Sequence, residues 1–547
     1  MVAILSGGRL LGAGCLALQF AACAATASSG QFPQLLDATL DELRRGLDGG
    51  QFSSVDLTKA YIARINEVSE QLHAVNVINP DALSIAAKLD SERSSGKVGG
   101  PLHGIPILIK DNIATDDKMD NTAGSFALVG AKVPEDSTVA AKLRKAGAII
   151  LGKANLSQWA NNRSNNGTSG WSAVGGQTIG AYFPGHDPLG SSSGSAVSSS
   201  IGLAWACLGT ETEGSIIAPA QANNIVGIKP TVGLTSRYLV VPVSEHQDTV
   251  GPMARTVKDA AHLLSAIAGK DSHDNYTAAI PFGDKVPDYV AACTASGLKG
   301  KRIGVPAGLT GSGSELSAPV VEAFRQALKL LQSSGAIIVD NVTLPALGQQ
   351  YRDANNIVQD ADFLTNLPKL YLNSLVTNPN NIKSLADLRA FTQKHPRENW
   401  PHRDTGVWDT ALKHGYSNDS PQFQQAYQKQ LYYAGQLGLT GALKNHTLDA
   451  IFAPWDHIAI MAAPLGNPAV TLPLGRMPDG TPVARNEFGN LNVIAPNLPF
   501  GVGFAGAPFS EEALIGMAYT LEQQTQVRTK IQPIVVPKTE LKDVVDK

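Results

Sequence analysis

Residues 105–110 read IPILIK, and residues 146–151 read AGAIIL. Both are short apolar runs with β-branched residues, which is typical of buried β-strands. Stretches with apolar residues at helical spacing, such as 137–145 and 257–268, alternate with these runs. Apolar strands that alternate with helices predict a mixed or largely parallel central sheet covered by helices on both faces, which is the α/β class.

The rest of the chain is organised around this core, which we place at residues 96–270. Residues 28–95 predict helices, and Thr39 with Glu42 has the form of a capping box at a helix start. Residues 271–445 are polar with weak periodicity and predict a helical insertion. Strand and turn signals return in 446–535, so we expect a single domain over 28–547.

Composition excludes several classes of function. The chain has 547 residues with Lys+Arg 44 against Asp+Glu 47, and no basic run, so a nucleic-acid partner is not expected. The 11 histidines are scattered without a His-Glu-x-x-His or Cys-x-x-Cys motif, and no glycine-rich loop ends in Gly-Lys-Ser/Thr. The sequence therefore predicts neither a metal nor a cofactor.

The N-terminus has the pattern of a secretory signal. Arg9 precedes small and apolar residues over 10–22, and Ala25-Thr26-Ala27 has the small-x-small form of a cleavage site. We expect residues 1–27 to be removed after Ala27 and the protein to be secreted. An N-terminal anchor and a lipid-modified Cys23 are the alternatives. No later run is long enough to cross a membrane, so no span is expected after signal removal.

Removal of the signal would leave Cys207 and Cys293 in the mature protein. One disulfide between them is left open, but it would not be the framework of the fold. Sequons at Asn275, Asn341 and Asn445 are compatible with a secreted protein.

Two serine motifs fit nucleophilic catalysis. Residues 190–194 read GSSSG, which fits the G-x-S-x-G turn that would present Ser192, although a flexible linker is the alternative for this serine-rich stretch. Residues 209–215 read GTETEGS after an apolar run. A strand that enters such a tight loop exposes successive N–H groups beside the Ser215 hydroxyl, as in an oxyanion hole, and an ordinary polar turn is the alternative.

A serine needs a base, and Lys110 is the candidate. It ends the apolar run of residues 105–110. Burial there would disfavour the ammonium form, so the neutral amine could accept a proton near pH 7. The alternative is an ordinary lysine at a strand end that reaches solvent.

With these motifs the sequence resembles the amidase signature family. Gly104-Ile105-Pro106 with Lys110-Asp111-Asn112, then GSSSGSA at 190–196, GTETEGS at 209–215 with Pro219, and GIKPT at 227–231 occur in the family's order. The resemblance extends over about 35–530 and, through GWSAVGGQT at 170–178, is strongest to the peptide amidases. It implies the amidase signature fold.

The resemblance also implies a Ser-Ser-Lys triad. Ser215 would be the acylated nucleophile, Ser191 the bridging serine at a cis peptide, and Lys110 the base. The groups implied to contact substrate or oxyanion are Ser191 and the N–H groups of Thr212, Glu213, Gly214 and Ser215. In this interpretation Ser192 is a neighbour of the site.

Three departures from the family pattern concern the substrate. Glu213 stands where many members have glycine, so its carboxylate must point away from the oxyanion. Ile217 replaces a common arginine, which we expect to leave the pocket wall without a cation and to disfavour small acidic substrates. Extra residues between Pro482 and Pro499 leave the pocket rim, and so the substrate, open.

The predicted function is hydrolysis of a small-molecule or peptide carboxamide, including C-terminal peptide amides, through an acyl-enzyme. A serine esterase that uses Ser192 and a histidine is one alternative. An amide hydrolase with a different substrate range is another, and a partner-dependent subunit that passes ammonia to a second active site is a third.

Overall fold

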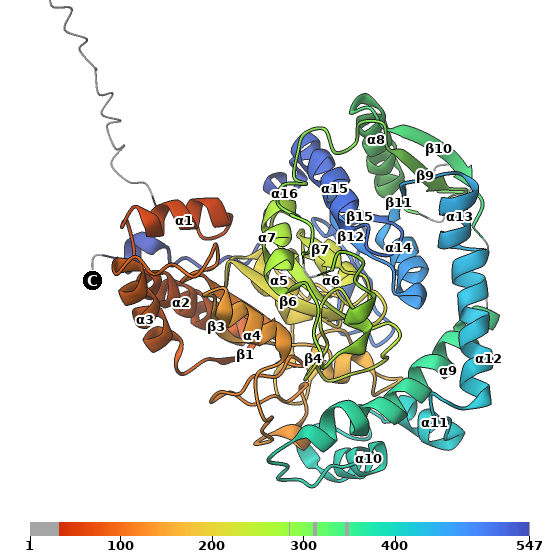
Figure 1. Cartoon of the computed structure of the whole chain (residues 1–547), viewed down its shortest axis with the longest axis horizontal. Coiled ribbons are helices and arrows are strands. Elements are labelled where there is room, and N and C mark those ends of the chain that lie inside the picture. Colours follow the sequence, from red (N-terminus) through yellow and green to blue (C-terminus); the bar gives the residue numbers. More distant parts are fainter. Residues whose placement is uncertain (1–31, 284, 310–313, 315, 345–348, 546–547) are drawn as a thin grey trace, which may run out of the picture.

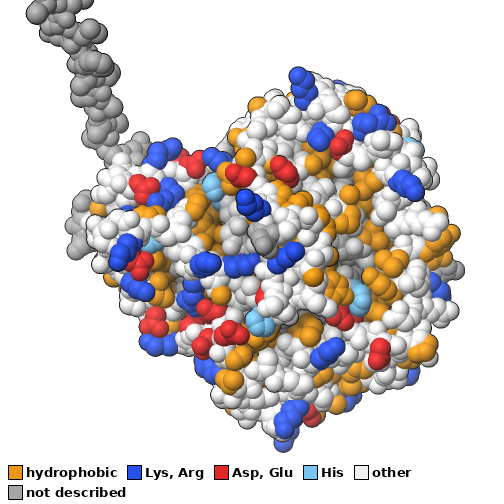
Figure 2. All heavy atoms as spheres, in the orientation of Figure 1, with side chains coloured by type: hydrophobic (Ala, Val, Ile, Leu, Met, Phe, Trp, Pro, Cys, Tyr) orange, Lys and Arg blue, Asp and Glu red, His pale blue; other side chains and the backbone are white. Residues whose placement is uncertain are grey.

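The computed structural model describes residues 32–283, 285–309, 314, 316–344 and 349–545. The predicted signal, with its cleavage site at Ala27, lies outside these residues. Within them, no helix combines the length and apolarity that a membrane crossing needs. Basic and acidic side chains both occur across the face shown in Figure 2.

One mixed sheet runs through the described chain (Figure 1). Its strands are, in spatial order, β1 (Val75–Ile78), β3 (Ile149–Ala154), β2 (Pro106–Lys110), β6 (Ala206–Glu211), β8 (Thr249–Ala254), β7 (Val226–Lys229), β12 (Ala469–Arg476), β15 (Pro499–Ala505), β11 (Ala450–Pro454), β9 (Arg302–Pro306) and β10 (Ile337–Val342). Two small ribbons lie apart from it, β4 (Trp171–Ser172) with β5 (Gly176–Gln177) and β13 (Ala484–Arg485) with β14 (Asn492–Ile494).

Helices surround this sheet. They are α1 (Leu40–Asp48), α2 (Ser54–Leu72), α3 (Ala82–Ser94), α4 (Thr138–Lys145), α5 (Ser193–Ser200), α6 (Ile217–Ala222), α7 (Val257–Ile267), α8 (Ala318–Ser333), α9 (Gln349–Asn366), α10 (Leu385–Lys394), α11 (Gly406–His414), α12 (Pro421–Gln430), α13 (Leu439–Asn445), α14 (Trp455–Ala462), α15 (Glu511–Thr525) and α16 (Val527–Lys530). In Figure 1, α1–α3 gather on one side of the sheet and α9–α12 border the other.

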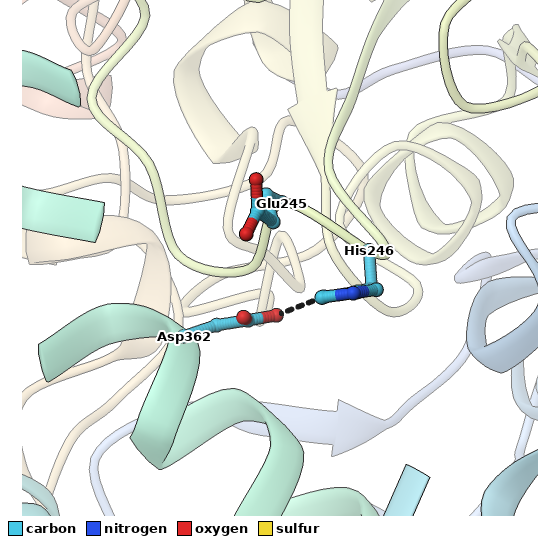
Figure 3. A group of neighbouring side chains, drawn as sticks. All are labelled: Glu245, His246 and Asp362. Atoms are coloured by element: carbon cyan, nitrogen blue, oxygen red, sulfur yellow. Dashed lines mark hydrogen bonds and ion pairs between the residues drawn. The ribbon is translucent and has the colours of Figure 1, made fainter. Parts of the chain in front are cut away.

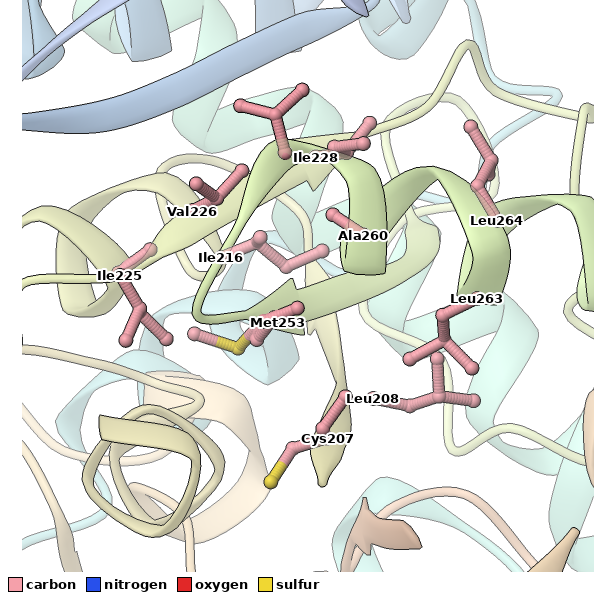
Figure 4. Packing of buried hydrophobic residues seen from close by; sticks show 14 of the residues in the cluster. Cys207, Leu208, Ile216, Ile225, Val226, Ile228, Met253, Ala260, Leu263 and Leu264 are labelled. Carbon is pink, nitrogen blue, oxygen red and sulfur yellow. The ribbon is translucent and has the colours of Figure 1, made fainter. Parts of the chain in front are cut away.

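The sheet confirms the α/β prediction and its mixed character. β2 is parallel to both β3 and β6, whereas β6, β8 and β7 follow one another in antiparallel order. Successive residues of a strand point to opposite faces, so a central strand can bury both. In Figure 4, Leu208 points towards Leu263 of α7 while Cys207 points away from it.

The sheet also includes strands that the sequence did not predict. β1 lies within 28–95, where we expected helices, and pairs with β3. β9 and β10 lie within 271–445, so this range extends the sheet as well as carrying helices. β1 and β10 are the two edge strands of the sheet, and β10 has several exposed side chains.

The serine-rich stretch is a helix and not a linker. α5 (Ser193–Ser200) is buried at every position and packs against β2, β3 and β6. A Cβ on Gly194 would lie 2.3 Å from the carbonyl oxygen of Ala74. Small side chains therefore let this helix approach its neighbours closely.

The two thiols are unpaired. Cys207 and Cys293 are both free, so the disulfide that the sequence left open is not formed. Cys207 is completely buried in the core of Figure 4, and burial raises the pKa of each thiol to about 12.

The two ends of the described chain meet beside α2. The predicted capping box is present, with Thr39 and Glu42 bonded reciprocally at the start of α1. Arg64 of α2 is buried and donates hydrogen bonds to the carbonyl of Thr539 at 2.6 Å and to Glu540 at 3.0 Å. Glu540 also accepts the N–H of Leu35 at 2.8 Å. The last residues therefore complete the packing of the first helices.

Candidate active site

Lys110 is the last residue of β2, at the edge where two parallel strands end. β2 pairs with β6 so that Ile109 lies opposite Leu208. The chain after β6 therefore turns at the same edge of the sheet as Lys110. The carboxyl ends of parallel strands are where α/β proteins place their ligand sites.

The Lys110 ammonium group is completely buried among polar atoms. Its Nζ lies 2.8 Å from Ser191 Oγ, 2.8 Å from Thr210 Oγ1 and 3.1 Å from the Thr210 carbonyl oxygen. Asn112 Nδ2 donates to the same Thr210 Oγ1 at 3.0 Å. Burial lowers the pKa of Lys110 to about 7, although the carboxylates of Asp248 and Glu211 oppose this shift. Both forms of the amine are therefore populated near neutral pH.

Ser191 lies in a tightly fixed turn that leads into α5. The peptide bond between Gly190 and Ser191 is cis. The Ser191 carbonyl accepts the N–H of Ser157 at 3.0 Å, and the Asp187 carboxylate accepts the N–H of Leu189 at 2.9 Å. These bonds hold the turn so that the Ser191 hydroxyl reaches Lys110.

Ser215 lies in the turn between β6 and α6. Gly214 has a φ of +76°, in the left-handed region that favours glycine. Glu211 Oε2 accepts the N–H groups of Ile216 at 2.7 Å and Ile217 at 2.9 Å. This carboxylate therefore occupies the first N–H groups after Ser215 and fixes the direction of the turn.

The N–H groups of residues 212–215 are free. No acceptor within the part of the chain that the structure describes takes a hydrogen bond from any of these four groups. Successive unbound N–H groups beside a serine hydroxyl are the donors that an oxyanion hole requires. Thr212, Glu213, Gly214 and Ser215 thus lie in one turn whose N–H groups have no acceptor among the described residues.

Two side chains of this turn are tied to other parts of the molecule. Thr212 Oγ1 donates to Asp248 Oδ1 at 2.6 Å, and Asp248 Oδ2 accepts the N–H groups of Val243 and Ser244. Glu213 Oε2 accepts a hydrogen bond from Asn355 of α9 at 2.9 Å. The Glu213 carboxylate is therefore directed to α9, and burial raises its pKa.

Ser215 opens on a cavity of about 590 Å³ between the core and the helices α9 and α11. Its ionisable lining residues are Glu213, Asp353, Asp360 and His414, and no Lys or Arg of the described chain lines it. Burial raises the pKa of Asp360 to about 7, and Asp360 Oδ2 lies 3.9 Å from His414 Nδ1. The wall of this cavity is therefore acidic.

The position of Ile217 corrects one expectation. The sequence suggested that this side chain forms the pocket wall beside Ser215, but Ile217 is completely buried in the hydrophobic core and does not line the cavity. The turn after Gly214 directs it inward. The lack of a cation at the wall instead follows from the residues that α9 and α11 supply.

Another part of the wall has unusual backbone. Trp159, Ala160 and Asn161 have φ values of 54°, 55° and 70°. Three successive non-glycine residues in the left-handed region are strained, and such strain concentrates at functional sites. Ala160 and Asn161 line the cavity, although nothing in the sequence pattern singled them out.

Ser192 is close to Ser215 but differently placed. Its side chain is completely buried, and its Oγ donates to the Thr210 carbonyl at 3.0 Å and accepts the Thr210 N–H at 3.2 Å. The hydroxyl thus uses both its donor and its acceptor capacity in hydrogen bonds to the backbone of β6. This arrangement disfavours Ser192 as a nucleophile.

The extra residues between Pro482 and Pro499 pack away from the cavity. They contain β13 and β14, and the N–H of Asn492 donates to the Gly185 carbonyl at 2.7 Å while its own carbonyl accepts the Asp187 N–H at 3.0 Å. No described residue of this segment lines the cavity. The segment supports the chain that precedes Ser191.

Among the described residues, Glu245, His246 and Asp362 form one group of three side chains whose ligand atoms are close enough to hold a metal ion (Figure 3). Asp362 Oδ2 already bonds His246 Nδ1 at 2.8 Å and Ser244 Oγ at 2.6 Å. The Glu245 carboxylate accepts from Asn418 at 2.6 Å. These contacts give the group a structural task, which is to join α9 to the loop that carries Asp248.

The structure thus brings Lys110 and Ser191 into direct contact and places Ser215 with its free N–H groups in the adjoining turn. Sequence reasoning missed Asp248 and Asn355, which hold this turn from the side. Asp248 follows an unremarkable polar stretch, and Asn355 lies in the range where periodicity was weak.

Comparison with known proteins gives matches along nearly the whole chain. The model of the Amidase family matches residues 56–515. A protein of Arthroderma benhamiae whose name places it among the amidases is 51% identical over 537 residues, which is 94% of this chain and 89% of the relative. One subunit of the glutamyl-tRNA(Gln) amidotransferase of Myxococcus xanthus is 32% identical, and the match covers 92% of this chain and 100% of the relative.

The fold also matches solved structures. Native peptide amidase from Stenotrophomonas maltophilia superposes with a TM-score of 0.82 at 38% identity, covering 93% of this chain and 100% of that one.

Proposed function

This chain belongs to the amidase family, whose members hydrolyse amide C–N bonds, and on that premise we propose that it cleaves carboxamides through a triad of Ser215, Ser191 and Lys110. The observation that carries the proposal is the buried Lys110, which lies 2.8 Å from Ser191 Oγ and whose pKa burial lowers to about 7. A buried amine that is neutral near pH 7 can act as a general base.

The contacts of Lys110 support one arrangement of its protons. The Thr210 carbonyl oxygen can only accept, and Thr210 Oγ1 lies within bonding distance of the same amine. A neutral Lys110 donates its two protons to these atoms, so its lone pair faces Ser191 Oγ. Ser191 then gives its proton to Lys110 and takes the proton of Ser215 as that hydroxyl attacks the carbonyl.

The turn that carries Ser215 stabilises the tetrahedral intermediate. The free N–H groups of residues 212–215 supply fixed donors to the oxyanion, and donors fixed in advance need no reorganisation during reaction. The Glu213 carboxylate is held by Asn355 and so does not compete for these donors. The proton on Lys110 returns through Ser191 to the leaving nitrogen, because an amide anion is a poor leaving group.

We propose primary carboxamides, including C-terminal peptide amides, as the substrate class. The likeness to peptide amidase over 93% of this chain supports this class. The acidic wall formed by Glu213, Asp353 and Asp360 disfavours a free carboxylate next to the scissile bond, which a peptide amide lacks. Ammonia release from a peptide amide, its free acid, an aryl amide and a long-chain acyl amide would test the class. Cleavage of internal peptide bonds or a preference for the long-chain amide would contradict it.

Labelling with a fluorophosphonate tests the nucleophile. We expect the probe to modify Ser215, and Ser215→Ala to lose both labelling and turnover. Ser192→Ala should keep most of its turnover per folded molecule. Ser195→Ala is the matched control, because Ser195 Oγ is equally buried on α5 and donates to the Leu208 carbonyl. Labelling of Ser192, or full activity in Ser215→Ala, would exclude the triad.

We also propose export of the protein with removal of residues 1–27, on the strength of the sequence pattern around Ala27. N-terminal sequencing of the protein recovered from culture medium should give Ser28 as the first residue. Recovery of the full-length chain inside the cell would contradict the proposal.

A further inference from the structure

A second cavity of about 240 Å³ adjoins the one that holds Ser215. The two share Asn161 as a lining residue. Ser157 also lines the second cavity, and its N–H donates to the carbonyl of Ser191. This second cavity therefore lies directly beside the proposed triad, between β4 and the loop that precedes α11.

Two arginines line it, and their surroundings differ. Arg163 is buried and neutralised, because it bonds the equally buried Glu398 carboxylate at 2.9 Å. Arg403 donates to the Asn166 carbonyl at 2.9 Å, and no carboxylate of the described chain comes within salt-bridge distance of it. Burial lowers the pKa of Arg403. Arg403 is thus a partly desolvated cation without a counter-ion.

Trp171 orients this guanidinium. The Arg403 Cζ lies 5.1 Å from the centre of the Trp171 ring, and the Arg163 Cζ lies 5.7 Å from it. A guanidinium whose face contacts an aromatic ring keeps the N–H groups along its own edge available. These groups can form a bidentate pair with a carboxylate.

Two hydroxyls add further donors. Ser157 Oγ accepts the N–H of Gly170 at 2.8 Å, and Ser164 Oγ accepts the N–H of Asn166 at 3.0 Å. No acceptor for either hydroxyl proton is found among the described residues. No Asp or Glu of the described chain lines this cavity. It therefore presents donors and positive charge, in contrast to the acidic wall opposite Ser215.

We propose that this cavity binds a carboxylate of the substrate, carried at a distance from the scissile amide, with Arg403 as the residue that recognises it. The substrate class becomes peptide amides with an acidic residue upstream of the amide. This inference rests on the proposed function, since it assigns a part of the substrate that Ser215 acylates. Arg403 sets specificity and takes no part in the chemistry.

The test uses N-acetyl-tetraalanine amide in which one alanine at a time is replaced by Glu or by its neutral twin Gln. At one position we expect KM to be about five- to tenfold lower for Glu than for Gln, with similar kcat. Arg403→Gln should remove this preference, so that the Glu and Gln peptides have similar KM values. Arg397→Gln is the matched control, because Arg397 stacks on Phe126 in the same segment but does not line the cavity.

Calorimetric titration of the same peptides into Ser215→Ala, with and without Arg403→Gln, reads binding apart from turnover. Equal dissociation constants for Glu and Gln peptides at every position, or a Glu preference that survives Arg403→Gln, would overturn the inference. Acetate binding that needs Arg403, without any Glu preference, would show a free-anion site and also overturn it. Fluorophosphonate labelling of a residue other than Ser215 would contradict the proposed function. The dissociation constants of the Glu and Gln peptides would still show whether the cavity binds a carboxylate.

Discussion

Two regions around Ser215 differ in structure. We call the buried layer beneath its turn the floor, and the helices that line the cavity the wall. The floor is the buried layer beneath the turn of Ser215, where Lys110 of β2 and Ser191, which precedes α5, are completely buried and held by strand pairing and hydrogen bonds. The wall comes from α9 and α11, where Asp353, Thr410 and His414 are exposed at the helix surface.

This difference separates the reaction from the choice of substrate. A change in the floor disturbs the packing of the central sheet, so its residues are constrained by folding as well as by chemistry. A change on the exposed wall alters charge and shape without opening the core. Asn355 is the point where the two regions meet, because it extends from α9 to the turn that carries Ser215.

The largest expected effect is on the floor, from Lys110→Met. Methionine fills similar volume in a buried strand, so the fold should persist while kcat/KM falls by roughly 10³-fold, because the base is lost. The comparison is Lys153→Met on the neighbouring strand β3. Lys153 is equally buried and bonds the Ile113 carbonyl and Asn121, and it contacts neither serine.

Steady-state kinetics and thermal melts of both variants would make this test. Lys153→Met should lose stability and keep kcat per folded molecule. An equal loss of kcat in the two variants would show that burial of a lysine in this sheet, and not its contact with Ser191, is what activity requires.

The pH profile sharpens the same comparison. The base must be neutral, so kcat/KM should rise with pH along a limb whose pKa is about 7. Asp248→Asn removes a carboxylate that raises the pKa of Lys110, so the limb should move to lower pH by roughly half a unit. The asparagine can keep the native contacts by accepting from Val243 and Ser244 and donating to Thr212.

Asp360 on the wall has a pKa near the same value, which makes it the natural control. Asp360→Asn should leave the position of the limb unchanged. A limb that moves with Asp360→Asn and not with Asp248→Asn would assign the titration to the wall.

Sequence could predict the residues of the floor because they lie at the ends of short apolar runs. Lys110 ends one run, and the turn that carries Ser215 directly follows another, so local patterns indicated both. The pairing of the two strands could not be read in the same way, and the resemblance to a family implied only the roles of Lys110, Ser191 and Ser215. The tie between Thr212 and Asp248 joins residues 36 apart, and the tie between Glu213 and Asn355 joins residues 142 apart. Such contacts depend on tertiary packing and leave no local signal.

The orientation of the Ile217 side chain shows a different limit of prediction from sequence. Its neighbours in sequence are compatible with a helix start, but the turn at Gly214 leads directly into α6, where every side chain is buried. A one-residue change in the phase of that turn would bring another side chain to the cavity. Sequence alone does not fix this phase.

A moderate effect is expected where floor and wall meet. Asn355→Ala removes the donor to the buried Glu213 carboxylate, which then becomes free to approach the oxyanion donors. We expect kcat to fall roughly tenfold with little change in KM. Gln359→Ala is the comparison one turn further along α9, because Gln359 reaches Asn355 only through Gln247 and does not bond the turn of Ser215. Stopped assays of both variants on one peptide amide would compare them.

A higher KM with unchanged kcat in Asn355→Ala would show that Asn355 affects only substrate binding, as a residue of the wall would. The same tenfold loss in Gln359→Ala would show that any truncation of α9 disturbs the turn, and the tie through Glu213 would lose its special role.

The smallest effect is expected on the wall itself. Burial raises the pKa of Asp360 to about 7, so this group carries roughly half a charge at neutral pH. Asp360→Asn should reduce the preference for a lysine-containing over a glutamine-containing peptide amide by roughly two- to threefold at pH 8. The effect should nearly vanish at pH 6, where the wild-type group is protonated. Ratios of kcat/KM at the two pH values measure it, and an equal effect at both would rule out titration of Asp360.

The contact of Arg64 in α2 with Thr539 and Glu540 constrains the order in which parts of the molecule can fold. Synthesis runs from the N-terminus, so Arg64 is made 476 residues before Glu540, and until then the guanidinium that will be buried lacks this counter-ion. The first helices can therefore complete this contact only after Thr539 and Glu540 have been made.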